Sequence, residues 1–168
     1  SSSNKIIPKD KIATVINNLR IKGKKIVFTN GCFDILHSGH IEYLERARGL
    51  GDILIVGLNS DSSVRRLKGQ GRPFNQQKER AKMLASLSSV NLVSIFHEDT
   101  PLKLIQNVNP DILTKGGDYS AKEIVGTKFV EGNGGYVQIL PFVEGISTTE
   151  IVKGIMQKHN SFNFKKKK

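Results

Sequence analysis

Tryptophan is absent from this sequence, and cysteine occurs only once, as Cys32. A single cysteine excludes an intramolecular disulfide framework and fits a reducing compartment, so we expect a cytoplasmic protein. Aromatic residues make up only 7% of the chain, which is a poor supply of stacking platforms for single-stranded nucleic acid. The sequence also lacks a secretory leader and an apolar stretch long enough to span a membrane, so we expect no membrane insertion.

Negative charge is scarce, because 26 lysine and arginine residues stand against only 15 acidic ones and give a net charge of +11. Four of these positive charges belong to Lys165–Lys168, but an excess remains without them. A basic protein favours anionic partners, and with so few aromatic side chains small phosphorylated molecules are the first candidates. A nucleic-acid-binding module is the alternative from another functional class.

Apolar, β-branched runs alternate regularly with helical patterns along the 168 residues. The runs predict five strands, at residues 25–30, 52–59, 90–96, 111–115 and 136–142. Helical patterns occupy residues 8–20, 39–50, 76–87 and 101–108, with further ones from Ser120 and Ser147 onwards. Strands separated by helices require crossover connections. We therefore expect an α/β fold: a single Rossmann-like, doubly wound domain with a five-stranded parallel sheet and helices on both faces.

Residue types at the expected helix starts support these boundaries. Asn75 is a candidate N-cap, and Thr100 precedes a proline at a first helical position. Ser120–Glu123 and Ser147–Glu150 each have the spacing of a capping box. We expect the chain to divide into a segment with a leading helix at 1–24, the main domain at 25–158 and a basic, disordered tail at 159–168.

Glycines, hydroxyl groups and cations follow the predicted strands at the points where these strands end. Ligands of doubly wound sheets bind beyond the carboxyl ends of the strands, so we expect the site at this edge. Residues 65–72, after the second strand, carry Lys68 and Arg72 beside two glycines and predict a basic, mobile phosphate-binding loop. The residues at the ends of the other strands are Thr29–Gly31, Gly116–Asp118 and Gly145–Thr149.

The segment TNGCFDILHSGH, at residues 29–40, contains the histidines His37 and His40. Zinc would need further ligands, and without another Cys/His cluster we expect no metal site. A strand that passes through a glycine turn into a helix presents backbone N–H groups and the positive end of the helix dipole to an anion. Gly39 allows a phosphate to approach, and two imidazoles can donate hydrogen bonds to it. An ordinary polar helix start remains the alternative.

TNGCFDILHSGH resembles the signature of the HxGH nucleotidyltransferases, and GISTTEI at residues 145–151 resembles their second signature. The resemblance extends from about Lys25 to Ile155 and implies that residues 25–158 are a nucleotidyltransferase domain. HIEYLERARGLGDILIVGLNSDSSVRRLKGQGRP and EDTPLKLIQNVNPDILTKGGDY are similar to the members that adenylylate D-glycero-β-D-manno-heptose 1-phosphate. This implies that ATP and the sugar phosphate give pyrophosphate and ADP-heptose for the lipopolysaccharide core. It also implies Mg²⁺ bound with ATP, a homodimer and a pathway link to a heptose kinase, with no stable nucleic-acid partner.

The resemblance, together with position in the predicted sheet, assigns roles to residues of these motifs. His37 and His40 would stabilise the charge on the α-phosphate and on the leaving pyrophosphate, and Lys68 would join them in catalysis. The sugar phosphate would be bound by Asp34, Arg72, Gly117 and Asp118. ATP would be held by Thr29, Asn30, Gly31, Phe33, Gly39, Gly145, Ser147, Thr148 and Thr149.

The reaction so implied is an in-line attack of the sugar phosphate oxygen on the α-phosphorus of ATP. The attacking oxygen is already anionic near neutral pH, so the site requires no general base but many hydrogen-bond donors and cations. The expected donor-rich, carboxylate-poor edge of the sheet fits that need. Three alternatives stay open. They are a related transferase, such as a cytidylyltransferase of glycerol 3-phosphate or another adenylyltransferase, a nucleotide sensor without turnover, and the nucleic-acid-binding module.

Overall fold

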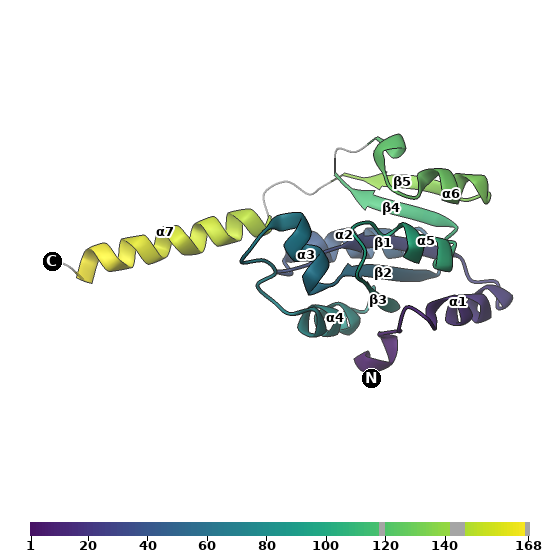
Figure 1. Ribbon diagram of the computed structural model, residues 1–168, viewed down its shortest axis with the longest axis horizontal. Coiled ribbons are helices and arrows are strands. Elements are labelled where there is room, and N and C mark those ends of the chain that lie inside the picture. The colour runs from purple at the N-terminus through teal and green to yellow at the C-terminus, as the bar shows by residue number, and fades with distance from the viewer. Residues whose placement is uncertain (118–119, 142–146, 167–168) are drawn as a thin grey trace.

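The structure, a computed structural model, describes residues 1–117, 120–141 and 147–166 (Figure 1). A parallel sheet with the strand order β3-β2-β1-β4-β5 forms its centre. This order confirms the predicted doubly wound α/β fold, because the chain adds strands first on one side of β1 and then on the other. The strands are β1 (Ile26–Gly31), β2 (Ile53–Asn59), β3 (Leu92–Phe96), β4 (Ile112–Gly116) and β5 (Tyr136–Leu140).

Helices connect successive strands and pack on both faces of the sheet (Figure 1). The α-helices are α1 (Ile12–Ile21), α2 (Ser38–Arg48), α3 (Asp61–Lys68), α4 (Gln77–Ser86), α5 (Leu102–Val108), α6 (Thr127–Gly132) and α7 (Thr148–Lys166). Short 3-10 helices are η1 (Ser2–Lys5) and η2 (Ala121–Glu123). Buried residues of α2 and α4 belong to one core cluster, and those of α1, α5 and α6 belong to a second.

Alternate residues of the central strands enter these two cores. Val27 of β1 contributes to the core shared with α2 and α4, whereas Ile26 and Phe28 contribute to the core shared with α1 and α5. Leu54 and Ile55 of β2 divide in the same way. A strand covered on both faces must be apolar at every position, and it therefore reads as a continuous apolar run. This explains why the runs located each strand to within about two residues.

The segment predicted as a basic loop after the second strand is helical up to Lys68. Ser60 caps this helix, α3, because its Oγ accepts a hydrogen bond from the N–H of Ser63 at 3.2 Å. Asp61 adds a negative charge to the first turn, which the helix dipole favours. The helix ends at Gly69, whose φ of +91° is a conformation that other residues rarely adopt. The basic loop is therefore shorter than expected and begins at this glycine.

Some of the predicted helix caps are present in the structure and others are not. Ser120 and Glu123 form the expected capping box, and Ser147 Oγ accepts from the N–H of Glu150 at 3.1 Å. Asn75 is not the N-cap of α4, since Gln76 occupies that position and the N–H of Asn75 donates to Asp34. The N-cap of α5 is Pro101 rather than the preceding threonine. The helical segment expected from Ser120 onwards is divided in the structure into η2 and the short helix α6, which Gly126 begins without a side-chain cap.

The last helix is longer than expected and projects away from the sheet (Figure 1). The segment 159–168, for which we expect a disordered tail, is helical as far as Lys166. No proline or glycine occurs between residues 155 and 166, so nothing in the sequence ends the helix once it has begun. Within the described ranges, no helix combines the length and apolar character that crossing a membrane requires.

Candidate active site

A cavity of about 540 Å³ opens at the carboxyl end of the sheet, next to the neighbouring strands β1 and β4. The order of strands reverses between these two, and in doubly wound sheets this switch point leaves a crevice for ligands. The loop after β1 and the starts of α2 and α7 contribute to the lining, together with the ends of α3 and β4. The predicted residues that line it are Asn30, Gly31, Phe33, Asp34, His37, Gly39, His40, Lys68, Arg72, Ser147, Thr148 and Thr149.

The remaining predicted residues do not line the described part of this cavity. Thr29 is buried beneath it, and its Oγ1 lies 2.8 Å from the hydroxyl of Tyr43, which does line the cavity. Gly117 is buried just beyond β4, and its N–H donates to the carbonyl of Leu140 at 3.0 Å. Asp118 and Gly145 lie outside the residues that the structure describes.

His37 is the N-cap of α2, with an extended backbone. Its Nδ1 accepts a hydrogen bond from the N–H of His40 at 3.4 Å, so the spacing of the two histidines closes the first turn of the helix. Burial lowers the pKa of His37, which favours the neutral ring at physiological pH. In a neutral ring whose Nδ1 accepts, the proton resides on Nε2. His37 therefore has one ring donor left for a ligand.

His40 is the more buried of the two histidines. Desolvation lowers its pKa to about 4, assisted by His37 and by the charge of Lys68 and opposed by the backbone of Ile35. The ring is thus neutral at pH 7, and it packs against Phe33 with centroids 5.2 Å apart. Among the described residues, nothing hydrogen-bonds its buried Nδ1. A buried nitrogen without a good hydrogen bond is costly, and the neutral form of the ring keeps this cost low.

Phe33 occupies a strained position in the turn between β1 and α2. Its φ is +46°, in the left-handed region that side chains other than those of Asn and Asp seldom adopt. The turn leaves no room on Gly31, because an added Cβ there would lie 2.8 Å from Cε2 of the Phe33 ring. The glycine therefore allows the ring to lie where it supports His40.

Three cations line the cavity, from three different segments: Lys68 at the end of α3, Arg72 in the following loop and Lys115 in β4. Sequence reasoning missed Lys115, although a lysine near the end of an otherwise apolar strand, DILTK, is an unusual choice. Burial lowers the pKa of Lys115 and Cys32 partly offsets this effect. The desolvated ammonium is well placed to gain from an anionic ligand.

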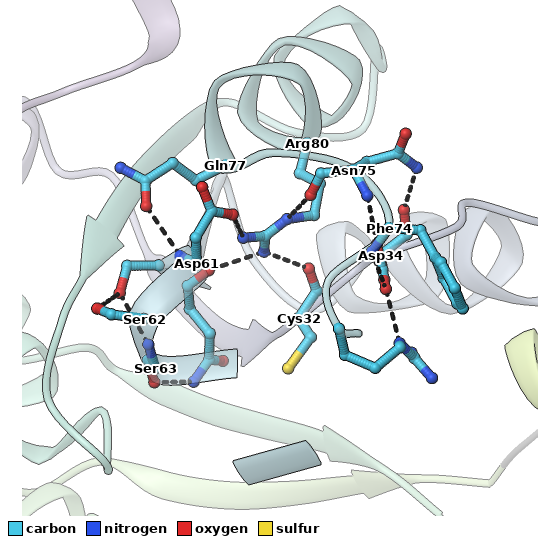
Figure 2. Close-up of polar contacts among 12 residues, drawn as sticks. Cys32, Asp34, Asp61, Ser62, Ser63, Phe74, Asn75, Gln77 and Arg80 are labelled. Carbon is cyan, nitrogen blue, oxygen red and sulfur yellow. Dashed lines mark hydrogen bonds and ion pairs between the residues drawn. The ribbon is translucent and has the colours of Figure 1, made fainter. Parts of the chain in front are cut away.

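Few of the described residues that line the cavity are acidic, and the buried one among them already has hydrogen-bond partners. Asp34 accepts hydrogen bonds from the Nε of Arg72 at 2.8 Å and from the N–H groups of Phe74 and Asn75 at 2.9 Å (Figure 2). Burial alone would raise the pKa of Asp34, but these three donors outweigh it and lower the pKa. The other acidic lining residue is Glu150. No group of three or more possible metal ligands occurs within the described ranges.

The thiol of Cys32 lies among these cations. Burial raises its pKa, while Lys68, Arg80 and Lys115 each act to lower it. Burial prevails, so the thiol stays protonated at neutral pH and is a poor nucleophile. Its carbonyl accepts a hydrogen bond from Arg80 at 2.8 Å.

The start of α7 also lines the cavity. Ser147 caps this helix, and Thr148 Oγ1 donates to the carbonyl of Ile35 at 3.5 Å, which ties the helix start to the loop before His37. Two helix N-termini, those of α2 and α7, therefore border one cavity. Backbone N–H groups and the helix dipole at each N-terminus attract anions.

The described part of the cavity thus brings a histidine pair, three cations and two helix N-termini together at the switch point of the doubly wound sheet, and each of these features can bind an anionic group. The sequence profile of the cytidylyltransferase-like family matches residues 28–154, and the chain belongs to that family.

Curated relatives agree with this assignment. The chain is 53% identical over 158 residues to the Bifunctional protein HldE of Citrifermentans bemidjiense, an alignment that covers 94% of this chain and 32% of that protein. It is 51% identical over 154 residues to the protein of the same name from Wolinella succinogenes, covering 92% of this chain and 32% of the relative. The chain thus spans about a third of the length of the curated relatives it matches.

Solved structures show the same fold. A lipopolysaccharide core biosynthesis protein from Thermoplasma volcanium is 31% identical, with a TM-score of 0.61 over 74% of this chain and 100% of that chain. A pantoate-beta-alanine ligase from Francisella tularensis is 19% identical, with a TM-score of 0.60 over 83% of this chain and 67% of the ligase. The second likeness concerns the fold alone.

Proposed function

We propose that this chain transfers the adenylyl group of ATP to D-glycero-β-D-manno-heptose 1-phosphate, releasing pyrophosphate and forming ADP-heptose for the lipopolysaccharide core. The observation that carries the proposal is the stacked, neutral pair His37 and His40 at the start of α2, facing a cavity lined by cations. The choice of sugar is supported by the sequence resemblance and by relatives named HldE that are about half identical to this chain. The likeness to a lipopolysaccharide core biosynthesis protein adds support.

The main obstacle to this reaction is electrostatic, because two polyanions must meet. The attacking phosphate oxygen is already ionised, so the site needs positive charge and orientation rather than a base. Lys68, Arg72 and Lys115 supply the charge from three segments of the chain that line the cavity. Lys68 and Arg72 act on the sugar phosphate and the leaving pyrophosphate, and Lys115 acts on the nucleotide.

The histidines act as neutral hydrogen-bond donors in this proposal. Nε2–H of His37 and the ring of His40 contact oxygens of the α-phosphate and of the departing pyrophosphate, where negative charge grows during the reaction. Donors held in place before the reaction stabilise such charge without reorganising.

The remaining predicted residues shape the nucleotide site. Asn30, Gly31, Phe33 and Gly39 form the turn that approaches the triphosphate, and Ser147, Thr148 and Thr149 hold its far end at the start of α7. Thr29 acts through the hydroxyl of Tyr43, and Asp34 acts on the substrate through Arg72. Gly117, Asp118 and Gly145 remain proposed contacts that rest on the sequence resemblance.

Magnesium is proposed to arrive with ATP. Among the described lining residues only Asp34 and Glu150 are acidic, and Asp34 already accepts three hydrogen bonds. These residues do not fit a metal centre held by the protein, since Mg²⁺ ordinarily takes protein carboxylates together with phosphate oxygens. Neutralisation of the bound anions therefore depends on the chain's own lysines and arginine.

Further proposals concern the setting of the reaction. We propose a cytoplasmic enzyme, because its single cysteine fits a reducing compartment and its substrates are cytoplasmic nucleotides and sugar phosphates. The resemblance supports a homodimer, a pathway link to a heptose kinase and the absence of a stable nucleic-acid partner. It also supports residues 25–158 as the nucleotidyltransferase domain.

A pyrophosphate-release assay tests the proposal. ATP and CTP are each paired with heptose 1-phosphate, other sugar 1-phosphates and glycerol 3-phosphate. We expect turnover with ATP and the heptose. Turnover with CTP and glycerol 3-phosphate would overturn the proposal in favour of a cytidylyltransferase, which the description of the matching family favours as the second candidate. ATP binding without pyrophosphate release would identify a nucleotide sensor.

A further inference from the structure

Arg80 lies beneath the cavity and has no solvent exposure. It is the fourth residue of α4, and its guanidinium donates four hydrogen bonds (Figure 2). The acceptors are Asn75 O at 2.9 Å, Cys32 O at 2.8 Å, Asn59 O at 2.7 Å and Asp61 Oδ1 at 2.8 Å. Four of its five N–H groups are therefore used, each toward a different segment.

These bonds join both ends of the segment that carries two of the cavity cations. We name residues 61–75 the cationic flap: it begins at Asp61, contains Lys68 and Arg72, and ends at Asn75. Arg80 bonds the first residue of the flap through a carboxylate and the last through a carbonyl. The same guanidinium also binds carbonyls at the ends of β1 and β2, so it fastens the flap to the edge of the sheet.

Other contacts hold the helical part of the flap and its two ends. Ser63 Oγ donates to Glu98 O at 3.0 Å, and Arg66 Nε donates to Asp99 Oδ1 at 2.6 Å. The N–H of Asp61 donates to Gln77 Oε1 at 2.9 Å, and Asp34 accepts hydrogen bonds from the 72–75 end. Between Lys68 and Arg72 the chain passes through Gly69 and Gly71, both with positive φ and with no atom within 4 Å of an added Cβ. Only the stretch between these two cations therefore has little support, and the segments on either side of it set their position.

We propose that Arg80 is a positioning residue, which places Lys68 and Arg72 over the cavity by fastening both ends of the cationic flap to β1 and β2. It touches no substrate, because it is fully buried. Only a planar guanidinium can direct four donors to four separate acceptors, so a lysine at this position keeps the charge but loses most of the geometry. The ligand that the flap binds is taken from the proposed function. The role of Arg80 in holding the flap to the sheet does not depend on that function.

The sequence contains a signal for this role. Arg80 precedes Leu84 by four residues and Leu87 by seven, so it lies on the apolar stripe of its helix. A charged residue on a buried stripe must be paired, and here its partners are backbone carbonyls and one carboxylate. Without the tertiary structure these partners could not be named.

The test compares Arg80→Lys with the unmodified chain in two measurements. Hydrogen exchange followed by mass spectrometry should show faster exchange in residues 61–75 than elsewhere in the variant. Calorimetric titration with MgATP should show about tenfold weaker binding. In a Lys68→Ala/Arg72→Ala background the same substitution should weaken MgATP binding far less, because Arg80 acts through those two residues.

A control separates positioning from general stability. Thr127→Val removes hydrogen bonds that a buried side chain on the far side of the fold makes to Ala121 O and Ile124 O. It should lower the melting temperature without changing exchange in the flap. If Arg80→Lys matches this control, with exchange rising uniformly and MgATP binding intact, the inference is wrong.

Two further outcomes remain decisive. If Arg80→Lys does not fold, Asp61→Ala removes one acceptor of the guanidinium at a half-buried position and should by itself raise hydrogen exchange in the flap. Unchanged exchange would contradict the inference. If the unmodified chain binds no MgATP, the proposed function fails, and the exchange measurement alone then decides whether Arg80 fastens the flap.

Discussion

The rings of His37 and His40 stack on each other with their centroids 3.8 Å apart and an angle of 21° between their planes. In the same pair, the Nδ1 of His37 accepts the backbone N–H of His40, so one spacing both caps α2 and orients the rings. Capping and phosphate binding, which are separate interpretations of the sequence, are therefore compatible in the structure. The cap fixes the tautomer that leaves the Nε2–H of His37 as a donor.

Replacing His40 by alanine should depress turnover far more than it raises the Michaelis constant. A donor that acts on charge formed during the reaction contributes mainly to the transition state, and its loss costs about 10²- to 10³-fold in turnover. Pyrophosphate release under saturating ATP measures this. His97→Ala, an exposed histidine outside the cavity, is the matched control and should retain full activity. Weaker ATP binding with unchanged turnover would contradict the assigned role.

The depressed pKa of His40 predicts a loss of stability in mild acid. Its pKa is about 4 in the folded protein and 6.5 ordinarily, so the unfolded chain binds more protons between these values. The contribution of neutral His40 to the free energy of unfolding is therefore complete above pH 6.5 and declines as the pH falls toward 4. After allowing for solvent near the cavity, we expect it to be on the order of 1 to 2 kcal/mol.

Urea unfolding at pH 7 and pH 5 tests this prediction. The unmodified chain should lose more free energy of unfolding between the two pH values than His40→Asn, which cannot titrate in that range. Asp34 does not affect this comparison. Because its pKa is lowered from the ordinary value of 3.8, the stability that it contributes is lost only below about that pH, outside the range measured. Equal losses in both proteins would show that His40 is not buried as a neutral ring.

Gly31→Ala should disturb the support of His40. The new Cβ would lie 2.8 Å from the Phe33 ring, which must shift away from the histidine that it packs against. Overpacking of this kind costs about 1 to 3 kcal/mol of stability, and turnover should fall as well. Gly132→Ala is the matched control, since nothing lies within 4 Å of its added Cβ. A Gly31→Ala variant with normal melting temperature and turnover would contradict the packing described.

Lys115→Ala should weaken the binding of MgATP by about tenfold, because the variant lacks a desolvated cation next to the proposed triphosphate site. Calorimetric titration measures this directly. Lys122→Ala removes an exposed lysine of η2 and should leave the affinity unchanged. Equal affinities for both variants would remove Lys115 from the nucleotide site.

The sequence predicted the sheet better than the helices, for a physical reason. Runs such as DILIVGLN must be apolar throughout when helices cover both faces of a strand, and this pattern is hard to miss. The helix α3 was hidden because arginines and lysine dominate its short length, although Ser60 and Asp61 are good start signals. The helix α6 begins at a glycine without a side-chain cap and gives no start signal.

Prediction of the site also succeeded for local motifs and failed where distant residues meet. Residues in contiguous motifs, such as His37, His40 and Thr148, were identifiable because a strand-to-helix turn and a capped helix start are local features. Lys115 was missed because its role depends on residues of other segments that line the same cavity, and the sequence alone does not bring them together. Asp34 was identified, but its partners in the 72–75 loop are about 40 residues away in the chain.

By itself the sequence determined which segments become strands, the order in which helices connect them, and the motifs that meet at the carboxyl edge. These properties depend on side-chain periodicity and helix capping, which act over a few residues. Only the tertiary structure decided how charge is distributed there. It pairs Asp34 with Arg72, places a half-buried Lys115 beside the cavity and directs the guanidinium of Arg80 to both ends of the cationic flap. Burial and pairing depend on distant partners, and they determine which charges remain available to a ligand.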